Sequence, residues 1–324
     1  MRLFLLPVST RRTLIYCERM HDKLASERSY LDKLTNKANE TWASWEKDEK
    51  SIANWKKTVT VYGNKAFKRI PFEEWGLKTV PALTAKRRKL ELEGKEKVEV
   101  IFPKRFVHEE RVPGILQQLA TERQALHKKT MIGSIVAMPF TAPFMLIPVI
   151  PNIPFFYLVF RAYSHWKALT GSKHLQFILE NKLLKPVPSS ELDEAYAAGL
   201  MYPTREASRT APLPTQEQVY EISSVVGKQT NDGSEDVMVL QRWNGKLIAE
   251  RFKLPEMEIE IERAVEQVET AIKGKEELLE EKRELERATA SPDNVQTKEP
   301  ADTKTPSEKF GETLREKKND IPKR

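Results

Sequence analysis

The sequence contains a single cysteine, Cys17, in 324 residues. One thiol excludes an intramolecular disulfide and a cysteine-based metal cluster. This cysteine usage is typical of a protein that works in a reducing compartment. We therefore interpret Cys17 as a small buried side chain, not as a reactive group.

The chain also lacks the short motifs of common catalytic and nucleotide-binding sites. Its five histidines form no His-Glu-x-x-His pair, and there is no Walker-type loop and no Gly-x-Gly-x-x-Gly loop. Adjacent acids such as Glu73 and Glu74 lie in polar stretches, where paired acids are usually at the surface. We therefore expect no enzyme activity, no cofactor and no metal site.

Charge is abundant but mixed in sign. Charged residues make up 31% of the chain, the formal net charge is +7 and the mean hydropathy is -0.55. Most of the chain is therefore expected to be exposed to water. Basic and acidic residues are interleaved and no recognition module occurs, so we expect no binding of nucleic acid.

One segment has no charge at all. No Asp, Glu, Lys or Arg occurs from Met131 to Phe160. A stretch of this length is difficult to bury in a domain this polar, so a lipid bilayer is the simpler explanation. The alternative is a pair of buried core helices.

Prolines argue against one straight helix in this segment, because each removes a backbone donor. One crossing takes about 20 residues and two take about 40. The pattern favours a hairpin or re-entrant loop over a single crossing, with helices over Thr130–Val149 and from Phe155 to Leu169. We assign the hinge between them to Pro148, Pro151, Asn152 and Pro154.

The second of these helices carries polar side chains at membrane depth. Arg161, Ser164 and His165 fall on one side at helical spacing. A lipid-facing Arg near the bilayer centre costs at least about 2.5 kcal/mol, so this side faces protein or water, or else the helix lies along the interface. Basic residues flank the segment at both ends, which predicts that both flanks lie on the same side of the membrane.

The N-terminal segment Met1–Cys17 has three arginines and no acid. This composition is typical of a mitochondrial import segment. The alternative is a pair of short strands, Leu3–Leu6 and Thr13–Tyr16, around a turn, and the two interpretations are compatible if the segment is not cleaved.

We predict a mainly α-helical membrane protein with a Pro-rich membrane hairpin, minor β structure, a charged C-terminal helix and a disordered tail. Local patterns predict an amphipathic helix or two over Arg19–Lys57, a strand at Val98–Phe102, a break at Lys185–Pro188 and a hairpin turn at Asn244-Gly245. The predicted regions are an N-terminal helical soluble region (1–129), the membrane hairpin (130–175), a small mixed region (176–254), a charged helix or short coiled coil (255–288) and the tail (289–324).

Three stretches resemble the mitochondrial potassium-proton exchange-related family. They are the opening RLFLLPVSTRRTLIYC, the Trp42-Ala43-Ser44-Trp45 helix, and the run PFTAPFMLIPVIPNIPFFYLVFRAYSHWKALTGSKHL from Pro139 to Leu175. The resemblance covers residues 2 to 200. It implies the mitochondrial inner membrane and a part in the potassium-proton exchange that controls matrix volume, and it supplies no catalytic residues.

The expected function is that of an accessory subunit or regulator, because an exchanger usually builds its ion site from several crossing helices and this chain offers at most two. The expected partners are the lipid bilayer and a protein of an inner-membrane exchange complex, with the soluble parts facing the matrix. The alternative is a membrane-anchored structural tether, or a membrane-shaping protein, without a transport role.

Overall fold

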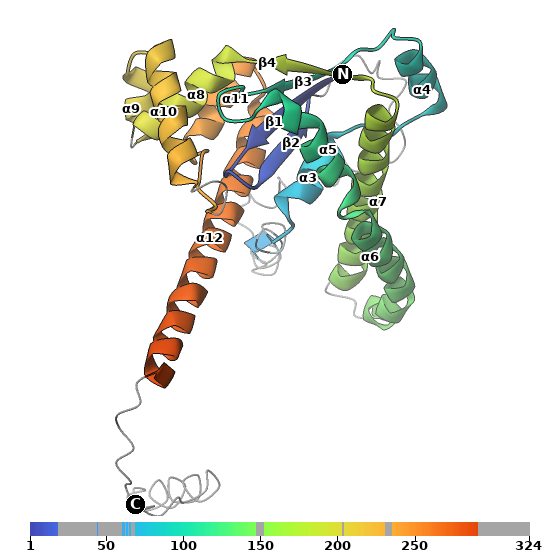
Figure 1. The fold of residues 1–324 in the computed structure, drawn as a ribbon. Coiled ribbons are helices and arrows are strands. Elements are labelled where there is room, and N and C mark those ends of the chain that lie inside the picture. Colours follow the sequence, from blue (N-terminus) through green and yellow to red (C-terminus); the bar gives the residue numbers. More distant parts are fainter. Residues whose placement is uncertain are drawn as a thin grey trace, which may run out of the picture. The chain divides into compact units, whose positions relative to one another are not determined.

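The computed structural model describes residues 1–18, 44, 60–61, 63, 65, 69–146, 152–202, 204–230 and 235–290. Within these residues the fold is mixed α/β, with helices on both faces of a four-stranded sheet (Figure 1). The chain divides into two compact units, Met1–Lys273 and Gly274–Arg324, and the fold described below is that of the first unit.

The sheet has the strand order β2-β1-β3-β4, in which β1 pairs antiparallel with β2 and parallel with β3, and β3 pairs parallel with β4. The strands are β1 (Arg2–Pro7), β2 (Thr13–Cys17), β3 (Val98–Phe102) and β4 (Leu184–Pro188). In β1 the side chains from Leu3 to Leu6 are completely buried. An unbroken apolar run of this kind suits a strand that is covered on both faces.

Helices follow the first hairpin and fill the connections between strands. They are α3 (Phe72–Thr79), α4 (Ala85–Leu92), η2 (Glu109–Arg111), α5 (Val112–Thr121), α6 (Gln124–Ala137), η3 (Met138–Leu146), α7 (Ile153–Glu180), α8 (Ser190–Met201), α9 (Arg205–Thr210), α10 (Gln216–Gln229), α11 (Asn244–Phe252) and α12 (Pro255–Ala290).

Alternate side chains of β1 point into two separate cores. Leu3 and Leu5 belong to a core that also holds residues of α3, α5 and α7. Phe4 and Leu6 belong to a core with residues of α8, α11 and α12. This alternation is the ordinary period of a strand, and it makes the sheet the middle layer of three.

Several local predictions are confirmed. The strand pair in Met1–Cys17, the strand at Val98–Phe102 and the charged helix near the C-terminus are all present. The predicted helices of Arg19–Lys57, apart from Ser44, and the predicted disordered tail beyond Ala290 lie outside the described residues.

The predicted α-helical membrane fold with a Pro-rich hairpin is wrong. The charge-free segment is divided among the end of α6, η3 and the beginning of α7. Pro139 and Pro143 fall in the 3₁₀ segment, which limits the length of α-helix available on either side. Among the residues that the structure describes, no helix has the length and apolar composition needed to span a membrane.

The predicted hinge residues have ordinary structural roles where they are described. Asn152 is the N-cap of α7, and its side-chain oxygen accepts a hydrogen bond from the Phe155 backbone at 3.1 Å. Pro154 lies in the first turn of α7, where a backbone N–H group has no partner within the helix, so proline costs no hydrogen bond there. Pro148 and Pro151 lie outside the described residues.

The predicted hairpin turn at Asn244-Gly245 is also wrong, because α11 begins there. The Asn244 side chain is completely buried and donates to the backbone oxygen of Ala195 in α8 at 2.8 Å. Its own oxygen accepts from the Gln241 backbone at 2.9 Å. These tertiary contacts override the turn preference of the Asn-Gly pair.

A glycine permits the close crossing of α3 and α7, which positions the site. A Cβ atom at Gly171 would lie 2.1 Å from the Leu77 backbone oxygen and 3.2 Å from that of Val80. We expect Gly171→Ala to lower the free energy of unfolding by about 3 kcal/mol, the upper end of the usual cost of overpacking, because both neighbours are backbone atoms. Urea unfolding followed by circular dichroism measures this change.

Gly133 in α6 provides the matched control. It is exposed, and no atom lies within 4 Å of a Cβ added there. Gly133→Ala should therefore stabilise the protein by up to about 1 kcal/mol through helix propensity. Equal effects at the two positions would show that α3 and α7 do not approach as closely as described.

Candidate functional site

Five polar side chains meet in the interior where α3, α6 and α7 pack together: Glu74, His127, Arg161, Ser164 and His165. We call this group the ionic cluster. Four of its members are at most 3% exposed, and the Arg161 side chain is 15% exposed. Buried polar groups at this density need mutual partners, since each would otherwise lose its hydration without compensation.

Helix geometry brings these residues together. Arg161, Ser164 and His165 are spaced i, i+3 and i+4 along α7, so they share one side of that helix. Glu74 lies in the first turn of α3, where the helix dipole favours a negative charge. His127 lies in the first turns of α6, which packs along α7.

Glu74 is the centre of the cluster. The Arg161 guanidinium donates to both of its carboxylate oxygens, at 3.0 and 3.3 Å. The Ser164 hydroxyl donates to Oε1 at 2.5 Å. Paired, charge-assisted hydrogen bonds of this kind are the stronger ones in proteins, and here they join α3 to α7.

The two imidazoles face each other. Their Nδ1 atoms are 3.0 Å apart, and the Nε2 atom of His165 lies 2.7 Å from the Arg161 guanidinium. A guanidinium only donates, so Nε2 of His165 accepts and its Nδ1 carries the hydrogen. That hydrogen is donated to Nδ1 of His127. The Nε2 atom of His127 is then protonated, and it is buried without a hydrogen-bond partner among the described residues.

Burial and charge set the protonation states. Burial alone would raise the pKa of Glu74, but the Ser164 hydrogen bond and the Arg161 charge bring it below the usual value. Burial lowers the pKa of His165 to about 4 despite the attraction of Glu74, and it also lowers the pKa of His127. At neutral pH the cluster therefore holds one carboxylate, one guanidinium and two uncharged imidazoles.

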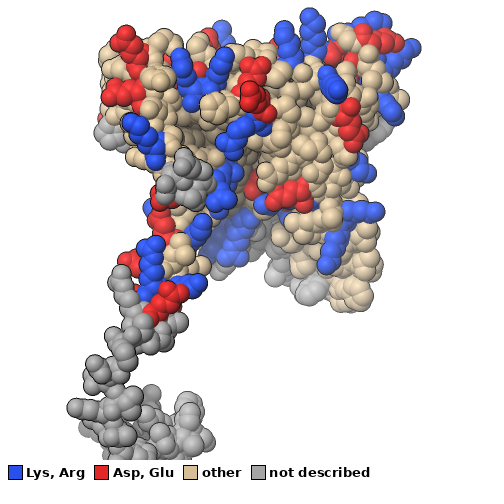
Figure 2. All heavy atoms as spheres, viewed as in Figure 1, with Lys and Arg blue, Asp and Glu red and all other residues tan. Residues whose placement is uncertain are grey.

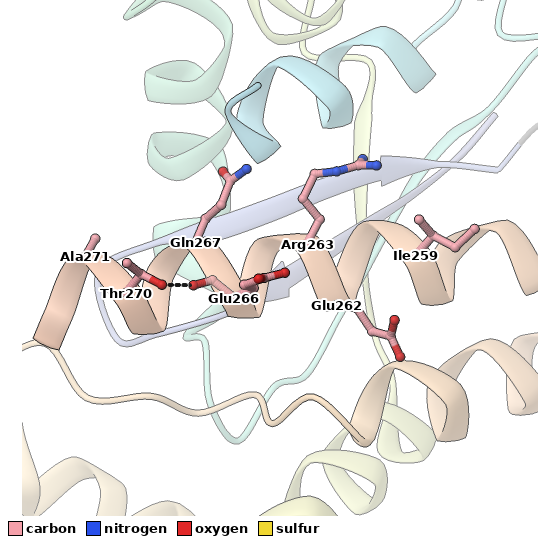
Figure 3. A pocket seen from close by; sticks show the side chains of 7 residues that line it. All are labelled: Ile259, Glu262, Arg263, Glu266, Gln267, Thr270 and Ala271. Atoms are coloured by element: carbon pink, nitrogen blue, oxygen red, sulfur yellow. Dashed lines mark hydrogen bonds between the residues drawn. The ribbon is translucent and has the colours of Figure 1, made fainter. Parts of the chain in front are cut away.

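The segment before α3 is fixed by α12. The Gln267 side chain accepts from the Phe72 backbone at 2.9 Å and donates to the Ile70 oxygen at 2.8 Å. Figure 3 shows Gln267 and Arg263 on the side of α12 that faces α3, beside a hollow of 460 Å³. The hollow is lined by α12 residues alone, and the Arg263 guanidinium stacks 4.3 Å from the Trp75 ring centre.

Two other buried acids lie apart from the cluster. Glu91 of α4 meets His174 of α7 at 3.0 Å, and the other ring nitrogen of His174 lies 2.7 Å from the Pro81 oxygen. Asp193 of α8 accepts from the Arg105 backbone at 2.9 Å, and burial raises its pKa to about 6. Each of these acids has a structural partner close by.

An exposed apolar surface lies at the far end of the α6–α7 pair. We call it the apolar end; it consists of Ile132, Ile135, Val136, Phe140, Phe155, Phe156, Tyr157 and Val159. In Figure 2 the lower end of the α6–α7 pair shows few charged side chains, and Lys and Arg side chains lie above it. Large contiguous apolar surfaces of this kind commonly mark a contact site for protein or lipid.

Three of the five cluster residues, Arg161, Ser164 and His165, are the polar side chains that the sequence places at membrane depth, facing protein or water, or else along the interface. The structure places them together inside the protein. The sequence predicts Glu74 to be a surface acid, and it shows His127 only as one of five histidines without a metal-binding motif. The polar side of α7 was the available signal, because a buried Arg requires an acid somewhere in the chain.

Comparison with known proteins supplies the family. The family model described as mitochondrial K+-H+ exchange-related matches residues 2–179. An uncharacterized protein of Schizosaccharomyces pombe is 31% identical over 197 residues, covering 60% of this chain and 82% of that relative.

An uncharacterized protein of Saccharomyces cerevisiae is 29% identical over 198 residues, covering 54% of this chain and 62% of that relative. No solved structure matches. The matched region contains β1, β2, β3 and the whole ionic cluster. The chain therefore belongs to the mitochondrial K+-H+ exchange-related family.

Proposed function

We propose that this protein is an accessory subunit or regulator of potassium-proton exchange in mitochondria, acting at the matrix face of the inner membrane without enzyme activity. The observation that carries the proposal is the apolar end of the α6–α7 pair. Family membership supplies the link to the exchange reaction, and the apolar end supplies a surface through which the protein can act on the membrane or its exchanger.

The chemistry of the apolar end suits the surface of a bilayer. Phe140 is 78% exposed and Phe156 is 61% exposed, and Tyr157 adds an aromatic ring with a polar tip. Such side chains favour the interfacial depth of a membrane. Contact of this kind buries apolar area at the boundary of one leaflet, and it needs no helix that crosses the bilayer.

Basic residues on α6 add an electrostatic component. Lys128 and Lys129 are exposed and precede the apolar end along the helix. A basic side chain near an anionic lipid surface contributes about 1 kcal/mol to binding. Apolar burial and charge together give two binding signals, which is what stable peripheral attachment requires.

The ionic cluster explains how the apolar end is held. Glu74 ties α3, which packs against the sheet, to Arg161 in α7. The one acid of the cluster, Glu74, is paired with Arg161, and this arrangement favours a structural role over passage of potassium through these residues. A partner exchanger of the inner membrane would then carry the ions.

The test is a swelling measurement in mitochondria. Cells that lack the protein receive either the wild-type chain or the double variant Phe140→Ser/Phe156→Ser. We expect potassium acetate to swell wild-type mitochondria rapidly. The deletion and the double variant should both swell slowly, and the variant should leave the membrane fraction at moderate salt because its apolar contact is lost.

Tyr220→Ser is the matched control. Tyr220 of α10 is 61% exposed, like Phe156, but it lies away from the apolar end. This variant should swell and fractionate as the wild type does. Normal swelling in the deletion would contradict a role in exchange, and normal swelling in a double variant that has left the membrane would contradict the role of the apolar end.

A further inference from the structure

We propose that Glu74, His127 and His165 form a binding site for a divalent transition metal ion, with Zn²⁺ as the best match. The three residues each offer one ligand atom, and these atoms all lie within 4.8 Å of one another. They come from three different helices, α3, α6 and α7. The inference goes beyond the proposed function and does not depend on it.

The distances between ligand atoms fit a tetrahedral ion. Zn²⁺ binds nitrogen and carboxylate oxygen at about 2.0 to 2.2 Å, which places neighbouring ligands about 3.3 Å apart. Nδ1 of His127 and Nδ1 of His165 are separated by 3.0 Å, and Nδ1 of His165 lies 3.7 Å from Oε2 of Glu74. These two values lie on either side of the ideal, and all three ligand atoms lie within 4.8 Å of one another, so side-chain movement is needed to bring every pair to the ideal.

The ligand set also suits the chemistry of such an ion. Imidazole nitrogens bind Zn²⁺ and other late transition metals well, whereas potassium prefers oxygen ligands. All three residues are at most 3% exposed. Imidazoles bind metal through a ring nitrogen that carries no hydrogen.

The groups around the ligands resemble the outer contacts of metal sites. Ser164 and Arg161 hold the Glu74 carboxylate by hydrogen bonds and fix its orientation. The buried Nε2 atom of His127 has no partner among the described residues. Metal-binding histidines usually donate their second ring N–H group to a carboxylate, a carbonyl or water, so His127 lacks this outer contact among the described residues.

Metal binding rearranges one contact. When Nδ1 of His165 binds the ion, the ring hydrogen moves to Nε2, which then cannot face the Arg161 guanidinium. Arg161 therefore gives up its contact with His165 and keeps its two bonds to Glu74.

Titration of the purified full-length chain tests the site. The protein is treated with a chelator, dialysed and titrated with Zn²⁺ in a calorimeter and with Co²⁺ in a visible spectrometer. We expect one ion per chain, the intense visible bands of tetrahedral Co²⁺, and a higher midpoint of thermal unfolding with Zn²⁺ bound, because a ligand that binds only the folded state stabilises it.

Substitutions at His127 separate this site from chance binding. His127→Gln should weaken Zn²⁺ binding at least about 100-fold, since loss of even an outer contact costs about 10- to 100-fold. His108→Gln removes an exposed histidine and should leave the affinity unchanged. Circular dichroism confirms that each variant is folded.

A cysteine provides a second variant that retains a ligand. His127→Cys should still bind Co²⁺ and should add a near-ultraviolet absorption from the cobalt-thiolate bond. Leu126→Cys places a thiol on the neighbouring exposed position and should add none. Absence of bound Zn²⁺ and Co²⁺ in the wild type, wild-type affinity in His127→Gln, or a thiolate band in Leu126→Cys alone would overturn the proposal.

Discussion

Replacement of Arg161 by leucine is expected to lower the free energy of unfolding by about 3 to 5 kcal/mol. The Glu74 carboxylate would lose both of its guanidinium contacts while it stays 2% exposed. An unpaired charge in the interior keeps the whole penalty of its lost hydration. Urea unfolding at neutral pH measures the change, with the slope of the transition checked for constancy.

A nearby pair and a double variant serve as controls for Arg161→Leu. Arg123 meets Glu73 at 2.9 Å, but these side chains are 33% and 21% exposed. Arg123→Leu should therefore cost less than about 1 kcal/mol. Glu74→Leu combined with Arg161→Leu should recover much of the loss, because no charge then remains buried. Equal costs for Arg161→Leu and Arg123→Leu would refute the buried ion pair.

Replacement of His174 by leucine is expected to cost about 3 kcal/mol or more. His174 and Glu91 are both completely buried, and the histidine joins the Glu91 carboxyl to the Pro81 backbone oxygen. Leucine leaves both of these groups without a partner, and each unsatisfied buried group costs about 1 to 3 kcal/mol. The contact connects α4 and the α3–α4 linker to α7, so proteolysis in that linker should also become faster.

Two variants distinguish the loss of polar contacts from the loss of a histidine as such. His174→Gln keeps one donor and should cost less than His174→Leu. His108→Leu, at an exposed position, should change the free energy of unfolding by no more than about 0.5 kcal/mol. A stable His174→Leu variant would show that Glu91 and Pro81 find other partners.

Local patterns in the sequence predicted individual strands and helices but not their assembly. Val98–Phe102 reads as a strand from its own residues, and the structure has that strand. The two prolines of Lys185–Pro188 predict only that a helix ends there. This segment forms β4, which lies at the edge of the sheet, where proline is tolerated.

The ionic cluster shows that local patterns also predict the position of side chains along one helix but not their partners on other helices. The spacing of Arg161, Ser164 and His165 could be read from one helix. Their partner Glu74 lies 87 residues before Arg161, and no local pattern marks it as buried. The membrane prediction for the charge-free segment fails for a related reason, because the composition of the segment resembles a membrane span while its prolines divide it between elements.

The parallel pairing of β1 has a consequence for synthesis of the chain. The antiparallel partner of β1, β2, is synthesised directly after it, whereas Val100 of β3, the parallel partner of Leu3, is synthesised much later. At about 5 to 20 residues per second this delay is roughly 5 to 20 s. The second face of β1 is covered in full only after α8, α11 and α12 have been synthesised, because all three contribute to that core. Until then the nascent protein exposes apolar side chains of β1, and we expect chaperones to bind it during synthesis.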